Sequence, residues 1–329
     1  MNKNFKISLI VLFAFILSIL FLIGFLHNLE PQLVSLQHQK NFYSQNFDSS
    51  TKIFLIGSSE VHRLNATFIE NYLSLHVDNY EVYNLGIHSD LPQRRIASVD
   101  AILSSDPEII VYGTGFREYH VPRTVENFNT NSDSNFLTLP QMFQLFQIID
   151  SNIPYDFSKL ESPKLHVLRF IRDSLVFRTP EVTPDMIKTN TPFMKYDKNM
   201  YSISSDKELE LFYQQPGREW PGIKNPSSDR TSDALNELIS IFKKNNIKVI
   251  LFTNPSNSYE LKKIGDDDVN IFVKNLQSIS QKNNIKVNFL HEKYINSSIF
   301  SHGNHVSMSE SGLIYSEDIA KIILKEIKN

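Results

Sequence analysis

The chain of 329 residues contains no cysteine and carries little net charge. Without cysteine it can form neither a disulfide framework nor a thiol nucleophile. Its formal net charge is -3 and its basic residues are dispersed, so it has no general attraction to polyphosphate. Nucleic acid is therefore not expected as a partner. The hydrophobic content of 41% indicates instead a folded protein with a substantial core.

Charge is absent from Ile7 to Leu26, a run made almost wholly of Leu, Ile, Phe and Val. About twenty helical residues are enough to cross the roughly 30 Å hydrocarbon core of a bilayer. Lys3 and Lys6 precede the run and the next basic residue is Lys40, so the positive-inside rule places the N-terminus in the cytoplasm. We expect a single-pass anchor in the cell membrane, with the following domain outside the cytoplasm. A cleaved secretory signal is the alternative, although no small-x-small site follows the run.

The sequence predicts three segments: a cytoplasmic tip with the anchor (1–27), a juxtamembrane linker (28–51) and a folded domain (52–329). In the domain, short apolar runs alternate with amphipathic stretches. The predicted strands are Ile53–Ile56, Val82–Leu85, Ile109–Tyr112, Val249–Phe252 and Val287–Leu290. The predicted helices are Ala66–Leu75, Pro92–Leu103, Asp233–Lys244, Val269–Gln281 and Ser309–Ile327. Continuous apolar runs are typical of parallel strands covered on both faces, so we expect a three-layer, doubly wound α/β fold with five parallel strands.

Residues 119–230 interrupt this alternation and are rich in Asn, Asp, Ser, Pro and aromatic residues. We interpret them as an insertion between the third and fourth strands, with helical patterns at Leu139–Ile149 and Leu165–Phe177. The insertion could form a lid over a site, or a satellite core that includes Trp220. The sequence leaves both interpretations open.

Residues that can carry out chemistry follow the first strand and precede the last helix. Ligands of an open parallel sheet bind at the carboxyl ends of its strands, where Gly57-Ser58-Ser59 ends the first strand. A serine on a tight strand-to-helix turn exposes its hydroxyl next to backbone donors for an oxyanion, although it could also merely cap the helix. His305, with His302 nearby, could supply the base. A zinc site is the other interpretation, but no third ligand has a recognisable spacing.

These segments resemble the GDSL or SGNH family of esterases, lipases and carbohydrate acetyltransferases, over about residues 52–118 and 248–325. The family's Gly-Asp-Ser block corresponds to Gly57-Ser58-Ser59, which implies Ser59 as the nucleophile. Its second block corresponds to Asn84–Asp90, which implies the backbone N–H groups of Ser59 and Ser89 as oxyanion donors. Its third block places Gly115 where the family has an oxyanion-binding asparagine. Its last block, Asp-x-x-His, corresponds to His302–His305.

The resemblance implies that Ser59 attacks an ester carbonyl and that His305 accepts and returns the proton. The imidazole of His302 would then orient His305 in place of the family's aspartate. Four residues could support the site: Asn84 in the second block, and Arg117, Glu118 and Asn254 at neighbouring strand ends. Arg117 would stabilise charge and Glu118 would act as an orienting carboxylate, although the two could equally form an exposed ion pair. Neither a metal nor another cofactor is implied.

Membrane-anchored, outward-facing members of the family that modify cell-surface polymers often carry Gly-Ser-Ser in the first block. This similarity implies an esterase or O-acyltransferase that acts on a surface glycan or lipid ester. The alternative is a catalytically impaired relative that serves as a binding or assembly component of the cell envelope. It is favoured by the missing groups, since losing one oxyanion donor costs about 100- to 1,000-fold and losing the orienting acid about 10,000-fold. The sequence identifies no protein partner.

Overall fold

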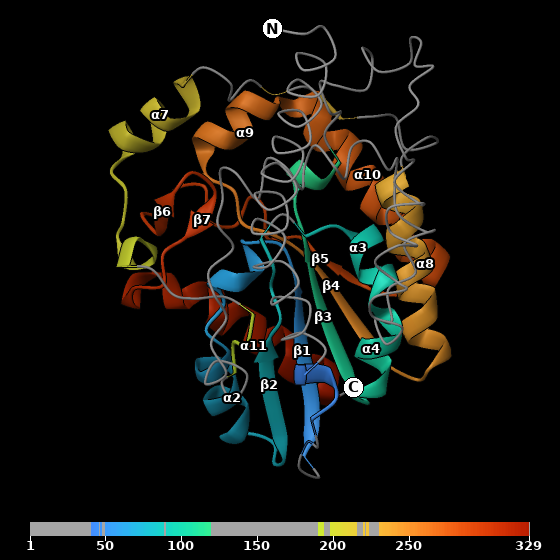
Figure 1. The fold of residues 1–329 in the computed structure, drawn as a ribbon. Coiled ribbons are helices and arrows are strands. Elements are labelled where there is room, and N and C mark those ends of the chain that lie inside the picture. The colour runs from blue at the N-terminus through green and yellow to red at the C-terminus, as the bar shows by residue number, and fades with distance from the viewer. Residues whose placement is uncertain are drawn as a thin grey trace, which may run out of the picture.

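The computed structural model describes residues 41–45, 47, 50–88, 90–119, 190–193, 198–215, 220, 222–223 and 230–328. They contain a five-stranded parallel sheet with the strand order β2-β1-β3-β4-β5 (Figure 1). The strands are β1 (Thr51–Gly57), β2 (Tyr80–Asn84), β3 (Ile109–Thr114), β4 (Lys248–Thr253) and β5 (Val287–Asn288). Every predicted strand is present, although β5 is shorter than its apolar run.

Helices cover both faces of this sheet, which gives the predicted three-layer α/β architecture (Figure 1). One face packs against α2 (Ala66–Ser74) and α11 (Leu313–Lys328). The other packs against α3 (Pro92–Ala97), α4 (Val99–Ser104), α8 (Arg230–Lys244) and α10 (Asp266–Asn283). Ile53 and Leu55 point into the α2/α11 core, whereas Phe54 and Ile56 point into the other. The strands are apolar runs because both of their faces are buried.

The described helices differ from the sequence prediction at several points. The pattern Pro92–Leu103 forms two helices, α3 and α4, because the chain leaves helical geometry at Ser98, whose hydroxyl donates to the Arg95 carbonyl at 3.3 Å. The last helix begins as a 3-10 turn, η7 (Glu310–Gly312). An unpredicted helix, α9 (Ser258–Ile264), follows β4.

A small antiparallel hairpin was also not predicted. Its strands are β6 (Phe300–His302) and β7 (His305–Val306), and the main sheet does not include them. Strands of two and three residues are too short to show a hydrophobic period. The hairpin carries both histidines of the predicted site.

The predicted insertion is described only in part, and its two helical patterns, like the predicted anchor Ile7–Leu26, lie outside the described residues. Its described elements include η5 (Lys198–Tyr201) and α7 (Asp206–Gln214), and α7 packs beside α9. Trp220 packs against the core and donates to Asp268, so this residue takes part in core packing. Among the described helices, none combines the length and apolar character needed to cross a bilayer.

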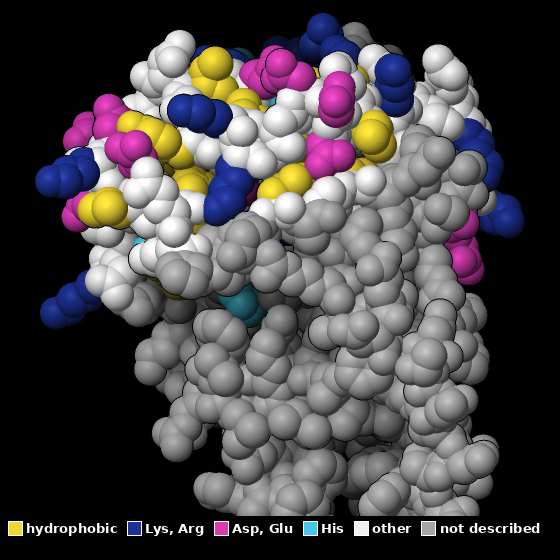
Figure 2. Space-filling view, turned by 90° about the horizontal axis from the view of Figure 1, so that it is seen from above, with side chains coloured by type: hydrophobic (Ala, Val, Ile, Leu, Met, Phe, Trp, Pro, Cys, Tyr) yellow, Lys and Arg dark blue, Asp and Glu magenta, His cyan; other side chains and the backbone are white. Residues whose placement is uncertain are grey.

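The topology points to one end of the sheet as a binding site. The chain passes from β1 to β2 on one side and then crosses to β3 on the other side of β1, so the switch point lies between β1 and β3. Gly57 of β1 pairs with Gly113 of β3 at the carboxyl end of this junction. Ligands of doubly wound sheets bind at such a position. Figure 2 looks onto this end, where acidic and basic side chains are interspersed over the described surface.

Candidate active site

The turn after β1 is held tightly at the carboxyl edge of the sheet. Gly57 has a φ of +150°, and a Cβ at this position would lie 2.4 Å from the Gly113 carbonyl oxygen, so only glycine fits. The Ser58 carbonyl then accepts from the backbone N–H of Val61 at 3.0 Å, where the short helix η1 (Val61–Arg63) begins. Ser59 therefore lies on the abrupt strand-to-helix turn that the sequence predicted.

The β6–β7 hairpin positions His305. Gly303 lies in its turn with a φ of +56°, and Asn257 donates from Nδ2 to the Gly303 carbonyl at 2.7 Å. Asn257 also accepts from the backbone N–H of Glu260 at 3.0 Å and so caps α9. One side chain thus joins the carboxyl end of β4 to the turn that carries His305.

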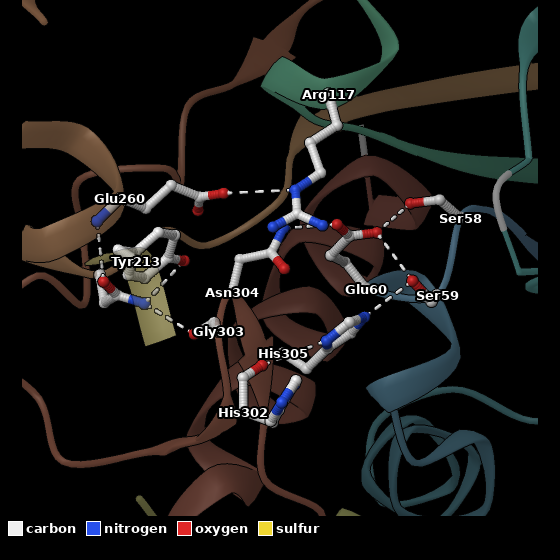
Figure 3. Close-up of polar contacts among 11 residues, drawn as sticks. Ser58, Ser59, Glu60, Arg117, Tyr213, Glu260, His302, Gly303, Asn304 and His305 are labelled. Atoms are coloured by element: carbon white, nitrogen blue, oxygen red, sulfur yellow. Dashed lines mark hydrogen bonds and ion pairs between the residues drawn. The ribbon is translucent and has the colours of Figure 1, made fainter. Parts of the chain in front are cut away.

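Ser59 and His305 contact each other, although 246 residues separate them in the sequence (Figure 3). The distance from His305 Nε2 to Ser59 Oγ is 2.8 Å. On the other side of the ring, Nδ1 lies 3.2 Å from the backbone carbonyl of His302. Because a carbonyl can only accept, Nδ1 carries the proton and Nε2 is left to accept from the serine. This is the tautomer that a general base for Ser59 requires.

The predicted role of the His302 imidazole is wrong, because the main chain of His302 makes the contact instead. Residues 302 and 305 are paired across the hairpin turn, so the carbonyl of His302 faces the ring of His305. The His302 imidazole is exposed and packs edge-on against Phe212 of α7, with ring centroids 4.4 Å apart. The His302 side chain therefore packs against α7 at the edge of the site.

A carboxylate that was not among the predicted site residues lies beside Ser59. Glu60 is buried, accepts from Ser58, and places Oε2 3.4 Å from Ser59 Oγ. Asn304 of the hairpin donates to Glu60 Oε1 at 2.6 Å. Figure 3 shows the Ser59 hydroxyl approached by the His305 ring and by the Glu60 carboxylate. The signal in the sequence was its position directly after Gly57-Ser58-Ser59, where the chain turns at the carboxyl edge of the sheet.

Burial and nearby charges keep His305 and Glu60 in the protonation states that general-base catalysis requires. Burial lowers the pKa of His305, and the positive charges of Arg63 and Arg117 lower it further against the opposing effect of Glu60. Burial would raise the pKa of Glu60, but the imidazolium form of His305, present at low pH, the Ser58 hydrogen bond and the charge of Arg117 hold it below its ordinary value. At neutral pH His305 is thus a neutral base and Glu60 an ionised neighbour.

Arg117 and Glu260 form the rim of this polar group. The Arg117 side chain is 42% exposed, and its Nε lies 3.8 Å from Oε1 of Glu260 on α9 (Figure 3). Burial raises the pKa of Glu260 to about 7, against the opposing charge of Arg117. Arg117 therefore places a positive charge next to Glu260 and Glu60, and its role in charge stabilisation stays a prediction.

Asn84 and Glu118 have structural contacts in this arrangement. Asn84 donates from Nδ2 to the carbonyls of Val61 and Leu64, and so ties the end of β2 to η1. Glu118 accepts from Thr114 Oγ1 at 2.6 Å and from the Gly115 N–H at 3.2 Å, at the start of the 3-10 helix η2 (Phe116–Glu118). The sequence had suggested Glu118 as the carboxylate that orients His305. A main-chain carbonyl, that of His302, makes this contact instead. Burial raises the pKa of Glu118 well above its ordinary value.

The predicted oxyanion residues have different outcomes. Ser89 lies outside the described residues, so its backbone N–H stays a prediction. Gly115 follows β3 at the expected edge, next to the side chain of Asn254 from β4. Within the described part of the chain, no group of three or more His, Cys, Asp or Glu residues forms a potential metal site.

The fold and site define a parallel, doubly wound α/β protein with a serine–histidine pair at its switch point. Neither a family model nor a curated protein matches the chain. Among solved structures, the lipase/acylhydrolase from Enterococcus faecalis is similar at a TM-score of 0.41 and 13% identity, covering 84% of this chain and 95% of that chain. At this level the likeness does not assign a family.

Proposed function

We propose that this chain is a serine esterase or O-acyltransferase of the SGNH type, with Ser59 as nucleophile and His305 as base. The 2.8 Å contact between His305 Nε2 and Ser59 Oγ carries the proposal. It joins a strand-end serine to a histidine in the segment before the last helix, which is the spatial relation that the resemblance implies. A hydroxyl within 2.6 to 3.2 Å of a correctly protonated imidazole meets the geometric requirement for general-base catalysis.

The proposed reaction proceeds through an acyl-serine. As Ser59 Oγ bonds to the ester carbonyl carbon, its proton passes to Nε2 of His305 and the carbonyl oxygen becomes an oxyanion. The imidazolium then protonates the departing alkoxide, and Ser59 keeps the acyl group. Water, or the hydroxyl of an acceptor molecule, attacks the acyl-serine while His305 again takes and returns a proton. The first acceptor gives hydrolysis and the second gives acyl transfer.

The structure offers substitutes for the missing triad acid. A triad acid holds the correct histidine tautomer and stabilises the imidazolium. Here the His302 carbonyl holds the tautomer through Nδ1, and Glu60 supplies negative charge next to Ser59. Loss of the acid costs about 10,000-fold mainly when the wrong tautomer results, so this site avoids the larger part of that cost.

The proposal extends to location and substrate. The uncharged run Ile7–Leu26, with lysines only on its N-terminal side, supports an anchor that exposes the domain outside the cytoplasm. The resemblance to outward-facing relatives supports an acyl ester on a surface glycan or lipid as substrate. Protease added to intact cells should then digest the domain, and full protection of the domain would contradict this topology.

A serine-directed probe tests the reaction. The full chain, purified in detergent, should react with a fluorophosphonate at Ser59 and hydrolyse p-nitrophenyl acetate. Ser59→Ala should abolish both signals, and His305→Ala should suppress both. Ser105→Ala is the matched control, since Ser105 is a buried serine that donates to the Tyr43 carbonyl away from the site. A folded chain that is neither labelled nor active would favour the binding component over the enzyme.

A further inference from the structure

Asn254 is a buried side chain whose hydrogen-bonding capacity is unused. It follows β4 at the carboxyl edge and is 3% exposed, and neither Oδ1 nor Nδ2 has a hydrogen-bond partner in the described structure. Its backbone is fixed, because its N–H donates to the Thr114 carbonyl at 2.8 Å. Buried polar groups nearly always have partners, so an unpaired amide at a candidate site suggests a ligand.

The direction of Asn254 follows from strand alternation. Ile250 and Phe252 of β4 point into the core beneath α2 and α11, and Asn254 continues this face beyond the end of the strand. Val306, next to His305, belongs to the same core. The Asn254 amide and the catalytic hairpin therefore lie on the same side of the sheet.

Gly113 places the amide beside the nucleophile turn. A Cβ on Gly113 would lie 2.7 Å from Asn254 Oδ1 and 2.4 Å from Cγ2 of Val61. Since Val61 belongs to the turn that carries Ser59, the amide approaches the same point as that turn. The absence of a side chain at residue 113 is what leaves room for both.

Gly115 brings the chain after β3 close to the same amide. A Cβ on Gly115 would lie 3.2 Å from Asn254 Nδ2. Gly113 and Gly115 together therefore leave the Asn254 amide its space at the carboxyl edge of the sheet, with Nδ2 on the side of Gly115.

We propose that Asn254 Nδ2 donates to the oxyanion that forms when Ser59 attacks an ester. The inference rests on the proposed function and assigns its oxyanion donor to β4 instead of β3. The donor is preorganised, because the amide is buried, its backbone is anchored and it has no competing hydrogen bond.

Kinetics of Asn254→Ala in the full chain test this assignment. Since the amide makes no hydrogen bond in the free protein, its removal should leave the melting temperature nearly unchanged. Loss of one oxyanion donor lowers kcat by about 100- to 1,000-fold with little change in KM. The rate of fluorophosphonate labelling should fall as well, because its phosphoryl oxygen occupies the oxyanion position. Asn254→Leu has a side chain of similar size without a donor, and it should lower kcat and the labelling rate as Asn254→Ala does. It replaces the alanine variant in the test if that variant does not fold.

Asn275→Ala is the matched control. Asn275 on α10 is equally buried, at 2% exposure, and both of its amide atoms also lack partners. Its substitution should leave kcat and labelling unchanged. If the unmodified chain shows Ser59-dependent turnover and Asn254→Ala stays within threefold of it, the assignment to Asn254 is overturned while the proposed function stands. If the unmodified chain shows no such turnover, both are overturned.

Discussion

Replacing Glu60 with glutamine removes a charge from beside Ser59, the proposed nucleophile, and keeps the shape of the side chain at residue 60. Ser59 Oγ lies 3.4 Å from Glu60 Oε2 and 2.8 Å from His305 Nε2, so the carboxylate and the ring nitrogen are no more than about 6 Å apart. Two unit charges at about 6 Å with an effective dielectric constant of about 20 attract by roughly 3 kcal/mol. Partial exposure of His305 reduces this attraction to about half. The remaining attraction of about 1.5 kcal/mol corresponds to a loss of about tenfold in kcat for Glu60→Gln.

The pH profile of the same variant gives an independent measurement. Because the negative charge of Glu60 favours the imidazolium, its loss should lower the pKa of His305 further. His305 then keeps its neutral, basic form down to a lower pH. The acidic limb of the kcat/KM profile should therefore shift to lower pH in Glu60→Gln. In the unmodified protein this limb already lies below the ordinary histidine value of about 6.5, since burial lowers the pKa of His305.

Glu118→Gln is the control for both measurements. Glu118 is a buried carboxyl at the same edge of the sheet, but burial raises its pKa well above the ordinary value, so glutamine removes little charge. Neither kcat nor the acidic limb should change much. If Glu60→Gln has kcat within twofold of the unmodified protein and its acidic limb does not move, the electrostatic role of Glu60 is refuted.

Two further predictions concern the elements that hold the nucleophile and the base. Gly57→Ala should destabilise the fold by about 2 to 4 kcal/mol in urea unfolding, because its Cβ would meet the Gly113 carbonyl. Gly265→Ala is the control, since Gly265 also has a positive φ but a Cβ there would meet nothing within 4 Å, and it should destabilise the fold clearly less. Equal destabilisation by the two substitutions would contradict the steric argument. Asn257→Ala should lower kcat by about tenfold, because the hairpin loses its 2.7 Å anchor at Gly303; unchanged kcat in a folded variant would show that His305 holds its position without it.

The sequence could predict the sheet and the serine–histidine pair, because each leaves a local pattern. Strands buried on both faces must be apolar runs, so all five were identifiable. The turn after β1 needs a glycine and a small polar residue, and Gly57-Ser58-Ser59 has both. His305 was identifiable because the last helix of a doubly wound sheet returns close to the first strand. These inferences require a few neighbouring residues and general rules of topology.

The supporting groups leave no such pattern. The main-chain carbonyl of His302 orients His305, and every residue has a carbonyl, so the sequence drew attention to the wrong part of His302. Asn254 was identifiable as a polar strand end, but its unpaired state depends on the space left by Gly113 and Gly115 on another strand. Glu60 follows Ser59 directly, but its second contact, with Asn304, comes from the distant hairpin and has no local pattern.

This hydrogen bond gives Glu60 a second role that can be separated from its charge. Asn304 donates to Glu60 Oε1 at 2.6 Å, and this contact joins the turn of the nucleophile to the hairpin of the base. Glutamine keeps an acceptor oxygen for Asn304 and loses only the charge, whereas alanine loses both. If the contact helps to dock His305 against Ser59, Glu60→Ala must have a lower kcat than Glu60→Gln. Asn304→Ala must also lower kcat, but without moving the acidic limb of kcat/KM as Glu60→Gln is expected to do. Equal kcat in the two Glu60 variants would mean that the charge alone acts, and that the hairpin is docked by Asn257 and its own packing.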